Sequence, residues 1–203
     1  YLDWGLHPGL NWIRDQSYGG PYAPKKWVYS RAEDASNLID KSSWTPGYLA
    51  LNVILVRFAD VLLMAAEAEI EAGSLEKARE YVNLVRARAA NPDSWVKAGD
   101  GSNAANYVIG LYNTPWTDKA AATTALQMER KLELAMEGHR FFDLVRWGIA
   151  PQVLNAYLAN EVANIPSSGF VGATFQATDI YQPIPQDEID LLGRDVLQQN
   201  AGY

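Results

Sequence analysis

The sequence contains no cysteine, only two histidines and no apolar run long enough to cross a bilayer. Without cysteine the chain has neither a disulfide framework nor a thiolate metal site, and nothing about its redox compartment follows. A membrane-spanning helix needs about twenty apolar residues. The most apolar stretch, residues 53–68, is interrupted by Arg57, Asp60 and Glu67. These absences exclude a cysteine-based site and a membrane-spanning helix.

Positive charge is also scarce, because 17 Lys and Arg face 24 Asp and Glu and give a formal net charge of −7. Nucleic-acid surfaces need clustered basic residues, whereas the basic residues here are interspersed with acids, so we expect no nucleic-acid partner. His139 lies close to Glu137, but His7 is far away in sequence. A lone imidazole is typical of a hydrogen-bonding residue, and we predict no metal site and no cofactor.

The composition of the 203 residues, 48% hydrophobic and 20% charged, is typical of a globular chain with one core. Residues 1–48 are rich in Trp, Tyr, Gly and Pro and lack a helical period, which predicts an irregular region packed on the helices. Residues 49–203 are predicted to form one globular helical unit. The predicted fold class is therefore mostly α, with extensive irregular loops.

Two helices are predicted between residues 52 and 89. The first runs to Ala72, with Phe58 and Leu62 on its apolar face, and Gly73 ends it. Ser74 then caps a second helix, which ends before Asn91 and Pro92. That helix is expected to bury four residues: Leu75, Ala78, Val82 and Val85. The short connection and the small residues between the helices resemble one tetratricopeptide-like hairpin.

A long third helix is predicted from about Ala120 to Trp147, with Thr117 or Asp118 as its N-cap. Its apolar residues point in nearly every direction, so its charges need partners. Spacings of three pair Glu137 with Arg140 and Asp143 with Arg146, and Arg130 can reach Glu133 or Glu129. We interpret five of these residues as a structural ion-pair network: Glu133, Glu137, Arg140, Asp143 and Arg146.

The remaining segments are less regular. Residues 91–119 form a polar excursion that is long for a simple connection. A short helix is predicted from Pro151 to about Leu158. Near the end of the chain, Pro183 and Pro185 enforce an extended backbone around Ile184.

Aromatic residues are abundant, with 7 Trp and 11 Tyr, and most of the Trp lie in predicted loops. A sugar ring has an apolar face and hydroxyl edges, which suits a Trp platform flanked by polar side chains. The alternative is that these aromatics pin long loops onto the helices. The candidate ligand-binding residues are Trp4, Trp12, Trp27, Trp95 and Trp116.

Catalysis by paired carboxylates is a further alternative, with Glu133 and Glu137 one helical turn apart. Glycosidase carboxylates usually face each other from different elements, whereas two acids on one turn usually bond to Arg side chains. The sequence also has no nucleophile-elbow motif, no phosphate loop and no dinucleotide fingerprint. We therefore predict no catalytic residue and a protein that is not an enzyme.

Four ordered motifs resemble one known family: RFADVLLMAAEAEIEAG from Arg57, VNLVRARA from Val82, ERKLELAMEGHRFFDLVRWG from Glu129, and the ending PIPQDEI with QQNAGY. Together they are similar to the C-terminal part of SusD/RagB outer-membrane lipoproteins. The segments YLDWG and PKK are also similar to this family. We therefore expect the chain to be the C-terminal portion of a longer protein whose N-terminal half carries the lipidated cysteine.

The resemblance implies a mostly helical fold in which tetratricopeptide-like hairpins support ligand-binding loops. It implies a non-catalytic protein on the surface of the outer membrane, held there by an N-terminal lipid anchor. Such a protein would bind an oligosaccharide, or a peptide in some members, and deliver it to a SusC-like TonB-dependent transporter. Two alternatives stay open: a scaffold that docks a partner protein while ligand contacts lie elsewhere, and an all-α glycoside hydrolase using Glu133 or Glu137.

Overall fold

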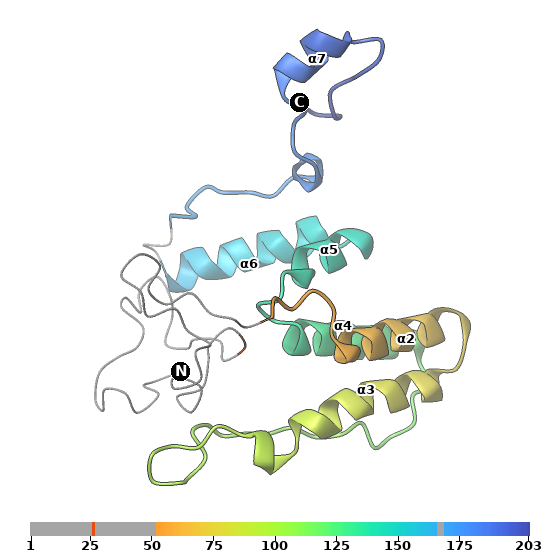
Figure 1. Cartoon of the computed structure of the whole chain (residues 1–203), viewed down its shortest axis with the longest axis vertical. Helices are drawn as coiled ribbons and strands as arrows, with labels where there is room; N and C mark the ends of the chain where they lie inside the picture. The colour runs from red at the N-terminus through yellow and green to blue at the C-terminus, as the bar shows by residue number, and fades with distance from the viewer. Residues whose placement is uncertain (1–25, 27–51, 166–168) are drawn as a thin grey trace. The chain divides into compact units, whose positions relative to one another are not determined.

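The computed structural model describes Lys26, residues 52–165 and residues 169–203 (Figure 1). In these residues the regular structure is helical apart from one isolated bridge between Lys97 and Asn103. The α-helices are α2 (Phe58–Ala72), α3 (Leu75–Ala89), α4 (Lys119–Glu133), α5 (His139–Arg146), α6 (Ala150–Asn164) and α7 (Gln186–Leu192). Two 3₁₀ turns, η2 (Pro92–Ser94) and η4 (Ala177–Ile180), complete the set. The predicted mostly α fold class is confirmed.

The chain divides into two compact units, Tyr1–Arg140 and Phe141–Tyr203, so that the boundary falls inside α5. The predicted irregular region, residues 1–48, lies outside the described residues apart from Lys26. Its packing on the helices and the boundary at residue 48 stay predictions. None of the described helices has the length and apolar character that crossing a membrane requires.

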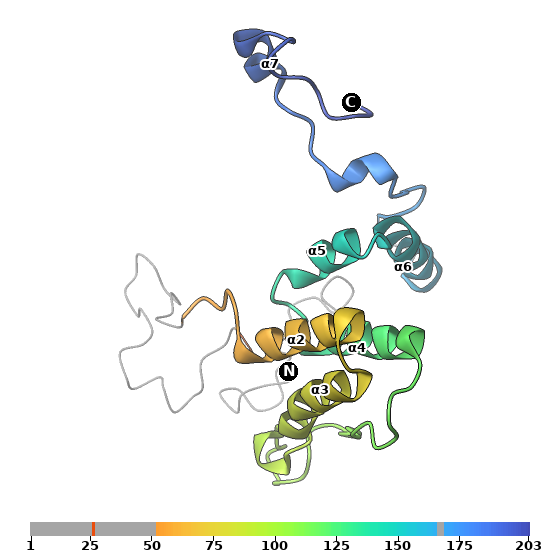
Figure 2. The same cartoon turned by 90° about the vertical axis from the view of Figure 1, so that its right-hand side faces the viewer.

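Helices α2 and α3 form the expected antiparallel hairpin (Figures 1 and 2). Gly73 ends α2, and the Ser74 hydroxyl accepts a hydrogen bond from the Lys77 amide at 3.3 Å, so α3 begins where the sequence predicts. The predicted start of the first helix at residue 52 is wrong, because α2 begins at Phe58. Arg57 is extended, with φ −113° and ψ 157°, and its side chain bonds to distant carboxylates instead.

Helix α4 packs beside this hairpin and completes the core of the first unit (Figure 2). The predicted apolar face of α2 is confirmed at Ala66 and Ile70, which are buried, but not at its start. Leu63 is fully buried, whereas Leu62 is only partly buried and Phe58 is 74% exposed. In α3, Ala78, Val82 and Val85 are buried as predicted, and Leu75 is partly buried. The core cluster consists of Leu63, Ala66, Ile70, Ala78, Val82, Val85, Ala122 and Leu126.

The prediction of one long third helix is wrong. Asp118 caps α4 by accepting from the Ala121 amide at 2.6 Å, but α4 ends at Glu133 and a turn separates it from α5. Gly138 has a φ of 83°, a left-handed conformation that suits glycine. The turn frees backbone carbonyls that a continuous helix would use, and Lys26 Nζ donates to those of Glu133 and Ala135 at 2.6 and 2.9 Å. Lys26, which is more than 100 residues away in sequence, thus binds the turn that separates α4 from α5.

In the second unit, α6 begins at Ala150 with a proline in its first turn and extends to Asn164, six residues beyond the predicted end. The segment before α7 is extended, with φ −52° and ψ 132° at Pro185, as the two prolines predict. Helix α7 then covers only Gln186–Leu192. Apart from α6, α7, the last part of α5 and the 3₁₀ turn η4, the described part of this unit consists of extended segments and turns.

Candidate functional site

Two of the five candidate tryptophans can be placed. Trp4, Trp12 and Trp27 lie outside the described residues, and their role stays a prediction. Trp95 and Trp116 lie near opposite ends of the α3–α4 connection, residues 90–118, and both are half-buried. Their surroundings differ in what they leave free for a ligand.

Trp95 is tied into its own loop. Its indole Nε1 donates to the Ala89 carbonyl at 3.0 Å, which binds the ring to the end of α3. Tyr107 stacks on the ring, with centroids 4.9 Å apart and planes 20° from parallel, and Lys97 Nζ lies 5.9 Å from the ring centre. The Tyr107 hydroxyl in turn accepts from the Val96 amide at 3.2 Å. These contacts are of the kind that the loop-pinning alternative predicts for Trp95, and its role as a ligand platform stays a prediction.

The second half of the connection, residues 107–116, runs back along α3 and is here named the strap (Figure 1). Asn83 holds it with both ends of its amide: Nδ2 donates to the Tyr112 carbonyl at 3.0 Å, and Oδ1 accepts from the Tyr112 amide at 2.9 Å. Arg86 Nε donates to the Gly110 carbonyl at 2.5 Å, and Arg79 also donates to the Tyr112 carbonyl. One face of α3 therefore fixes the backbone of the strap.

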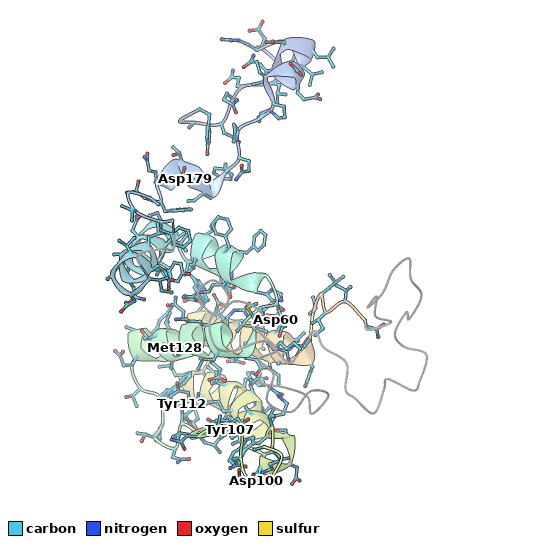
Figure 3. The ribbon with its side chains drawn as sticks, turned by 90° about the vertical axis from the view of Figure 1, so that its left-hand side faces the viewer. Asp60, Asp100, Tyr107, Tyr112, Met128 and Asp179 are labelled. Carbon is cyan, nitrogen blue, oxygen red and sulfur yellow. The ribbon has the colours of Figure 1, made fainter. Side chains whose placement is uncertain are left out.

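The side chains of the strap are also anchored. The Arg86 guanidinium lies 4.8 Å from the centre of the Tyr112 ring, and Tyr112 meets Trp116 edge to face at 5.3 Å. Both rings pack against the core of the first unit. Figure 3 shows Tyr107 and Tyr112, both residues of the strap, lying along α3.

A hollow of about 550 Å³ opens where the strap meets α4. Its wall combines aromatic, small and polar side chains, among them Tyr112, Asn113, Thr114, Trp116, Thr117 and Asp118. This volume lies within the range of about 300–1,000 Å³ that is typical of small-molecule sites. The hollow makes Trp116 the better placed of the two described candidates.

The predicted carboxylates occupy a different place, a cluster of charges around the α4–α5 turn. Arg57 binds Glu137 with two nitrogens, at 2.9 and 2.7 Å, and its third nitrogen donates to Glu133 Oε1 at 2.7 Å. Arg88 donates to the other oxygen of Glu133 at 2.6 Å, and Lys26 pairs with Glu137. The Glu137 side chain is fully buried, so both of its oxygens are bound inside the protein.

These contacts shift the pKa values of two residues of the cluster, Glu137 and Arg57. Burial alone raises the pKa of the Glu137 carboxyl, but the hydrogen bonds and charges of Arg57 and Lys26 more than offset it and hold the pKa below its ordinary 4.5. The hydrogen bond to Glu137 is the main reason that the pKa of Arg57 is raised. A glycosidase acid needs a raised carboxyl pKa, so the shift at Glu137 has the opposite direction.

Two further ion pairs join helices across the first unit. Arg130 Nη1 donates to Asp60 Oδ1 at 2.8 Å, and both residues are 4% exposed. Arg86 Nη1 donates to Glu129 Oε2 at 2.6 Å. The sequence offered Glu129 and Glu133 as partners of Arg130 within its own helix. The structure instead joins Arg130 of α4 to Asp60 of α2, which Figure 3 labels.

The last two residues of the predicted network lie in the second unit. Arg146 Nε donates to Asp143 Oδ1 at 3.0 Å, which confirms this predicted pair, and the guanidinium also lies over the Trp147 ring. Arg140 is half-buried at the end of the first unit. His139 is half-buried, and no described residue is a hydrogen-bond partner of its Nε2, against the expectation of a satisfied imidazole. Among the described residues, no cluster of three His, Asp or Glu could hold a metal ion.

We name the arrangement at Asn83, in which one side-chain amide binds the backbone N–H and C=O of a single residue, an amide clamp. The second unit also contains amide clamps. The Asn155 amide exchanges two hydrogen bonds with the backbone of Phe175, both at 2.8 Å. The Gln199 amide does the same for Ile184, at 2.7 and 2.9 Å. In each case a side-chain amide pairs with one residue of an extended segment as a neighbouring β-strand would. The PIP segment is thus held by the QQN sequence that follows it.

Sequence reasoning missed most of the residues that build the strap and the charge cluster. Arg79, Asn83 and Arg86 share one face of α3, a spacing of three to four that marks a polar face with a function. Arg57 begins the RFADV motif and Lys26 ends PKK, but nothing in either segment indicates that both side chains bind Glu137. The available signal was the density of charges on an apolar helix, because charges that are largely buried need partners.

The fold and its loops define a class of protein: a tetratricopeptide-like helical scaffold that carries an ordered, aromatic-rich connection. The model of the SusD family matches residues 6–203. The chain therefore belongs to the SusD family, as the four motifs predicted.

Individual relatives agree. The chain is 39% identical over 104 residues to SusD-like protein P25 of Formosa agariphila, a match that covers 51% of this chain and 16% of that protein. It is 35% identical over 156 residues to SusD-like protein P2 of the same organism, covering 75% of this chain and 26% of the relative. A SusD homolog from Bacteroides thetaiotaomicron matches with a TM-score of 0.57 and 28% identity, covering 77% of this chain and 28% of that structure. The chain thus spans between about a sixth and somewhat over a quarter of these relatives.

Proposed function

We propose that this chain is part of a non-catalytic glycan-binding protein that captures oligosaccharides at the cell surface. Membership of the SusD family is the observation that carries this proposal. Delivery to a SusC-like TonB-dependent transporter, an outer-membrane location and an N-terminal lipid anchor belong to the same proposal. A peptide ligand is the alternative within the family resemblance.

The aromatic residues supply the chemistry for glycan capture. The proposed platforms are Trp4, Trp12, Trp27, Trp95 and Trp116, and the surroundings of Trp116 support the proposal most directly because a hollow opens beside it. Stacking one indole face against a sugar buries about 100 Å² and contributes about 2.5 kcal/mol. A few such contacts give affinities weak enough for the ligand to be passed on.

The carboxylates support binding rather than hydrolysis. Glu133 and Glu137 are bonded to Arg57, Arg88 and Lys26, and the lowered pKa of Glu137 keeps it ionised at neutral pH. A residue in that state donates no proton to a leaving group. The two glutamates therefore act in this proposal as framework residues.

The test is a titration of the full-length protein with candidate oligosaccharides, followed by Trp fluorescence and calorimetry. We expect saturable binding without turnover, and chromatography of the recovered sugar checks that it is intact. Absence of binding to every glycan, or hydrolysis abolished by Glu133→Gln or Glu137→Gln, would overturn the proposal. Alanine at all five Trp that leaves affinity intact but weakens co-purification with the transporter would favour the partner-docking alternative.

A further inference from the structure

We propose that the hollow beside Trp116 is a subsite for one ring of a neutral oligosaccharide, with the Trp116 indole as its stacking surface. This inference rests on the glycan-binding function proposed above and goes further by naming the site on this chain and the charge class of the sugar. It also gives Trp116 a role different from that of Trp95, although both are ligand-binding candidates on sequence alone.

The shape of the hollow suits a sugar ring. Its volume of about 550 Å³ is of the size that small ligands occupy, and Trp116 and Tyr112 contribute two rings set edge to face. The apolar face of a pyranose packs on an indole, while its hydroxyl groups need hydrogen-bonding partners around the rim. Asn113, Thr114 and Thr117 are exposed polar residues of the lining and can supply those partners.

The charge of the lining selects between sugar classes. Among the described residues that line the hollow there is no lysine or arginine, and Asp118 is the one with a carboxyl group. Uronate and sulfate groups need cationic or multiple N–H donors, and a nearby carboxylate repels them. The Arg79 and Arg86 guanidiniums lie behind the strap, bonded to backbone carbonyls, Glu76 and Glu129. The lining therefore favours neutral rings over acidic ones.

The Trp116 stacking surface is also preorganised by contacts within the protein. Asn83 holds both backbone groups of Tyr112, and the rings of Tyr112 and Trp116 pack against the core. A platform fixed in this way loses little conformational freedom on binding, so more of the stacking energy appears as affinity. Trp95 differs because Tyr107 stacks on its ring and its indole N–H is bonded to Ala89.

The experiment measures affinity of the full-length protein by calorimetry for two panels of hexasaccharides. The neutral panel contains glucose, mannose, xylose and galactose oligomers, and the acidic panel contains oligogalacturonate and a sulfated galactan. The variants are Trp116→Ala and Trp116→Phe, with Tyr157→Ala as the control, because Tyr157 is a half-exposed aromatic on α6 that is not among the described residues lining the hollow. A circular dichroism melt checks that each variant is folded.

Because Trp116 packs against the core, a second variant leaves that packing alone. Thr114→Arg places a cation at an exposed position of the rim. We expect it to weaken neutral-sugar binding about threefold or more and to strengthen acidic-sugar binding, since a guanidinium pairs with carboxylate and sulfate.

For the native protein we expect a neutral hexasaccharide to bind more tightly than any acidic one. Trp116→Ala should weaken that binding at least about tenfold, Trp116→Phe less, and Tyr157→Ala by less than about twofold. If a glycan binds but neither Trp116→Ala nor Thr114→Arg changes its affinity, the subsite is wrong and the proposed function stands. A native preference for acidic sugars overturns the charge class, and absence of all glycan binding overturns both proposals.

Discussion

The two units of the molecule are each stabilised internally by a different kind of contact. The first unit buries apolar residues from three helices and joins the same helices by ion pairs between residues up to 70 positions apart. Among the described residues of the second unit, the buried apolar side chains are Leu144, Ala150 and Ile189, and its extended segments are held by side-chain amides 15 to 20 positions away. Contacts between buried residues far apart in sequence stabilise the first unit, and hydrogen bonds between residues closer in sequence stabilise the second. We therefore expect them to respond differently to mutation.

Removing the cation of the buried pair in the first unit should have the largest effect. Arg130→Met leaves the Asp60 carboxylate buried with this partner lost, and we expect it to lower the free energy of unfolding by about 3–5 kcal/mol in urea denaturation. Lys119→Met breaks the exposed pair with Glu71 and should cost less than about 1 kcal/mol.

A double variant sharpens this prediction. Asp60→Leu combined with Arg130→Met removes both charges and should be less destabilising than Arg130→Met alone. If the double variant is the less stable of the two, the cost does not arise from an uncompensated buried charge.

The amide clamps come next. Gln199→Leu removes both partners of the Ile184 backbone and should reduce the free energy of local opening there by about 1–3 kcal/mol, measured by amide hydrogen exchange. Asn83→Leu should have a smaller effect at Tyr112, because Arg79, Arg86 and core packing also hold the strap. Equal effects at the two clamps would contradict the difference between the units.

The third prediction concerns pH. The pKa of Glu137 is lowered in the folded protein, so its contribution to stability is present above its ordinary pKa of 4.5 and is lost as the pH falls through the lower folded value. Below about pH 4.5 the native protein should lose stability more steeply than Glu137→Gln, by at most about 1.4 kcal/mol per pH unit from this group. Denaturant titrations between pH 3 and pH 6 make the comparison. Identical slopes would mean that Glu137 is not held ionised by Arg57 and Lys26.

The smallest effect is expected at a helix cap of the first unit. Ser74→Ala removes the hydroxyl that accepts from Lys77, and the free energy of unfolding should fall by about 1 kcal/mol. Ser74→Asp keeps an acceptor and serves as the control. In α7 of the second unit, Pro185 occupies the N-cap and offers no side-chain acceptor, so Pro185→Ala removes no such bond. A thermal melt of each variant tests this ranking.

Local signals gave the hairpin correctly. Ser74, Gly73 and Pro92 fix the ends of α2 and α3 through backbone chemistry that the sequence displays directly. The break between α4 and α5 could not be found in that way. Apolar residues surround the whole stretch, so periodicity favours one helix, and the contacts that accompany the turn come from Lys26 and Arg57.

The candidate site was predictable in kind but not in detail. Composition indicated that loop tryptophans matter, yet Trp95 and Trp116 both have polar neighbours in sequence. The difference lies in their contacts in the folded chain: Tyr107 stacks on Trp95, whereas a hollow opens beside Trp116. The Asn83 clamp on Tyr112 spans 29 residues and has no signature in either segment alone.

Asn83 grips the main chain of residue 112 and makes no demand on the identity of its side chain. A loop held by its backbone can change its surface residues over generations while staying in place. The scaffold and the ligand preference can then evolve almost independently, with α3 conserving the grip and the strap varying the contacts. A protein built in this way can gain a new specificity from such a loop without a change to its helices.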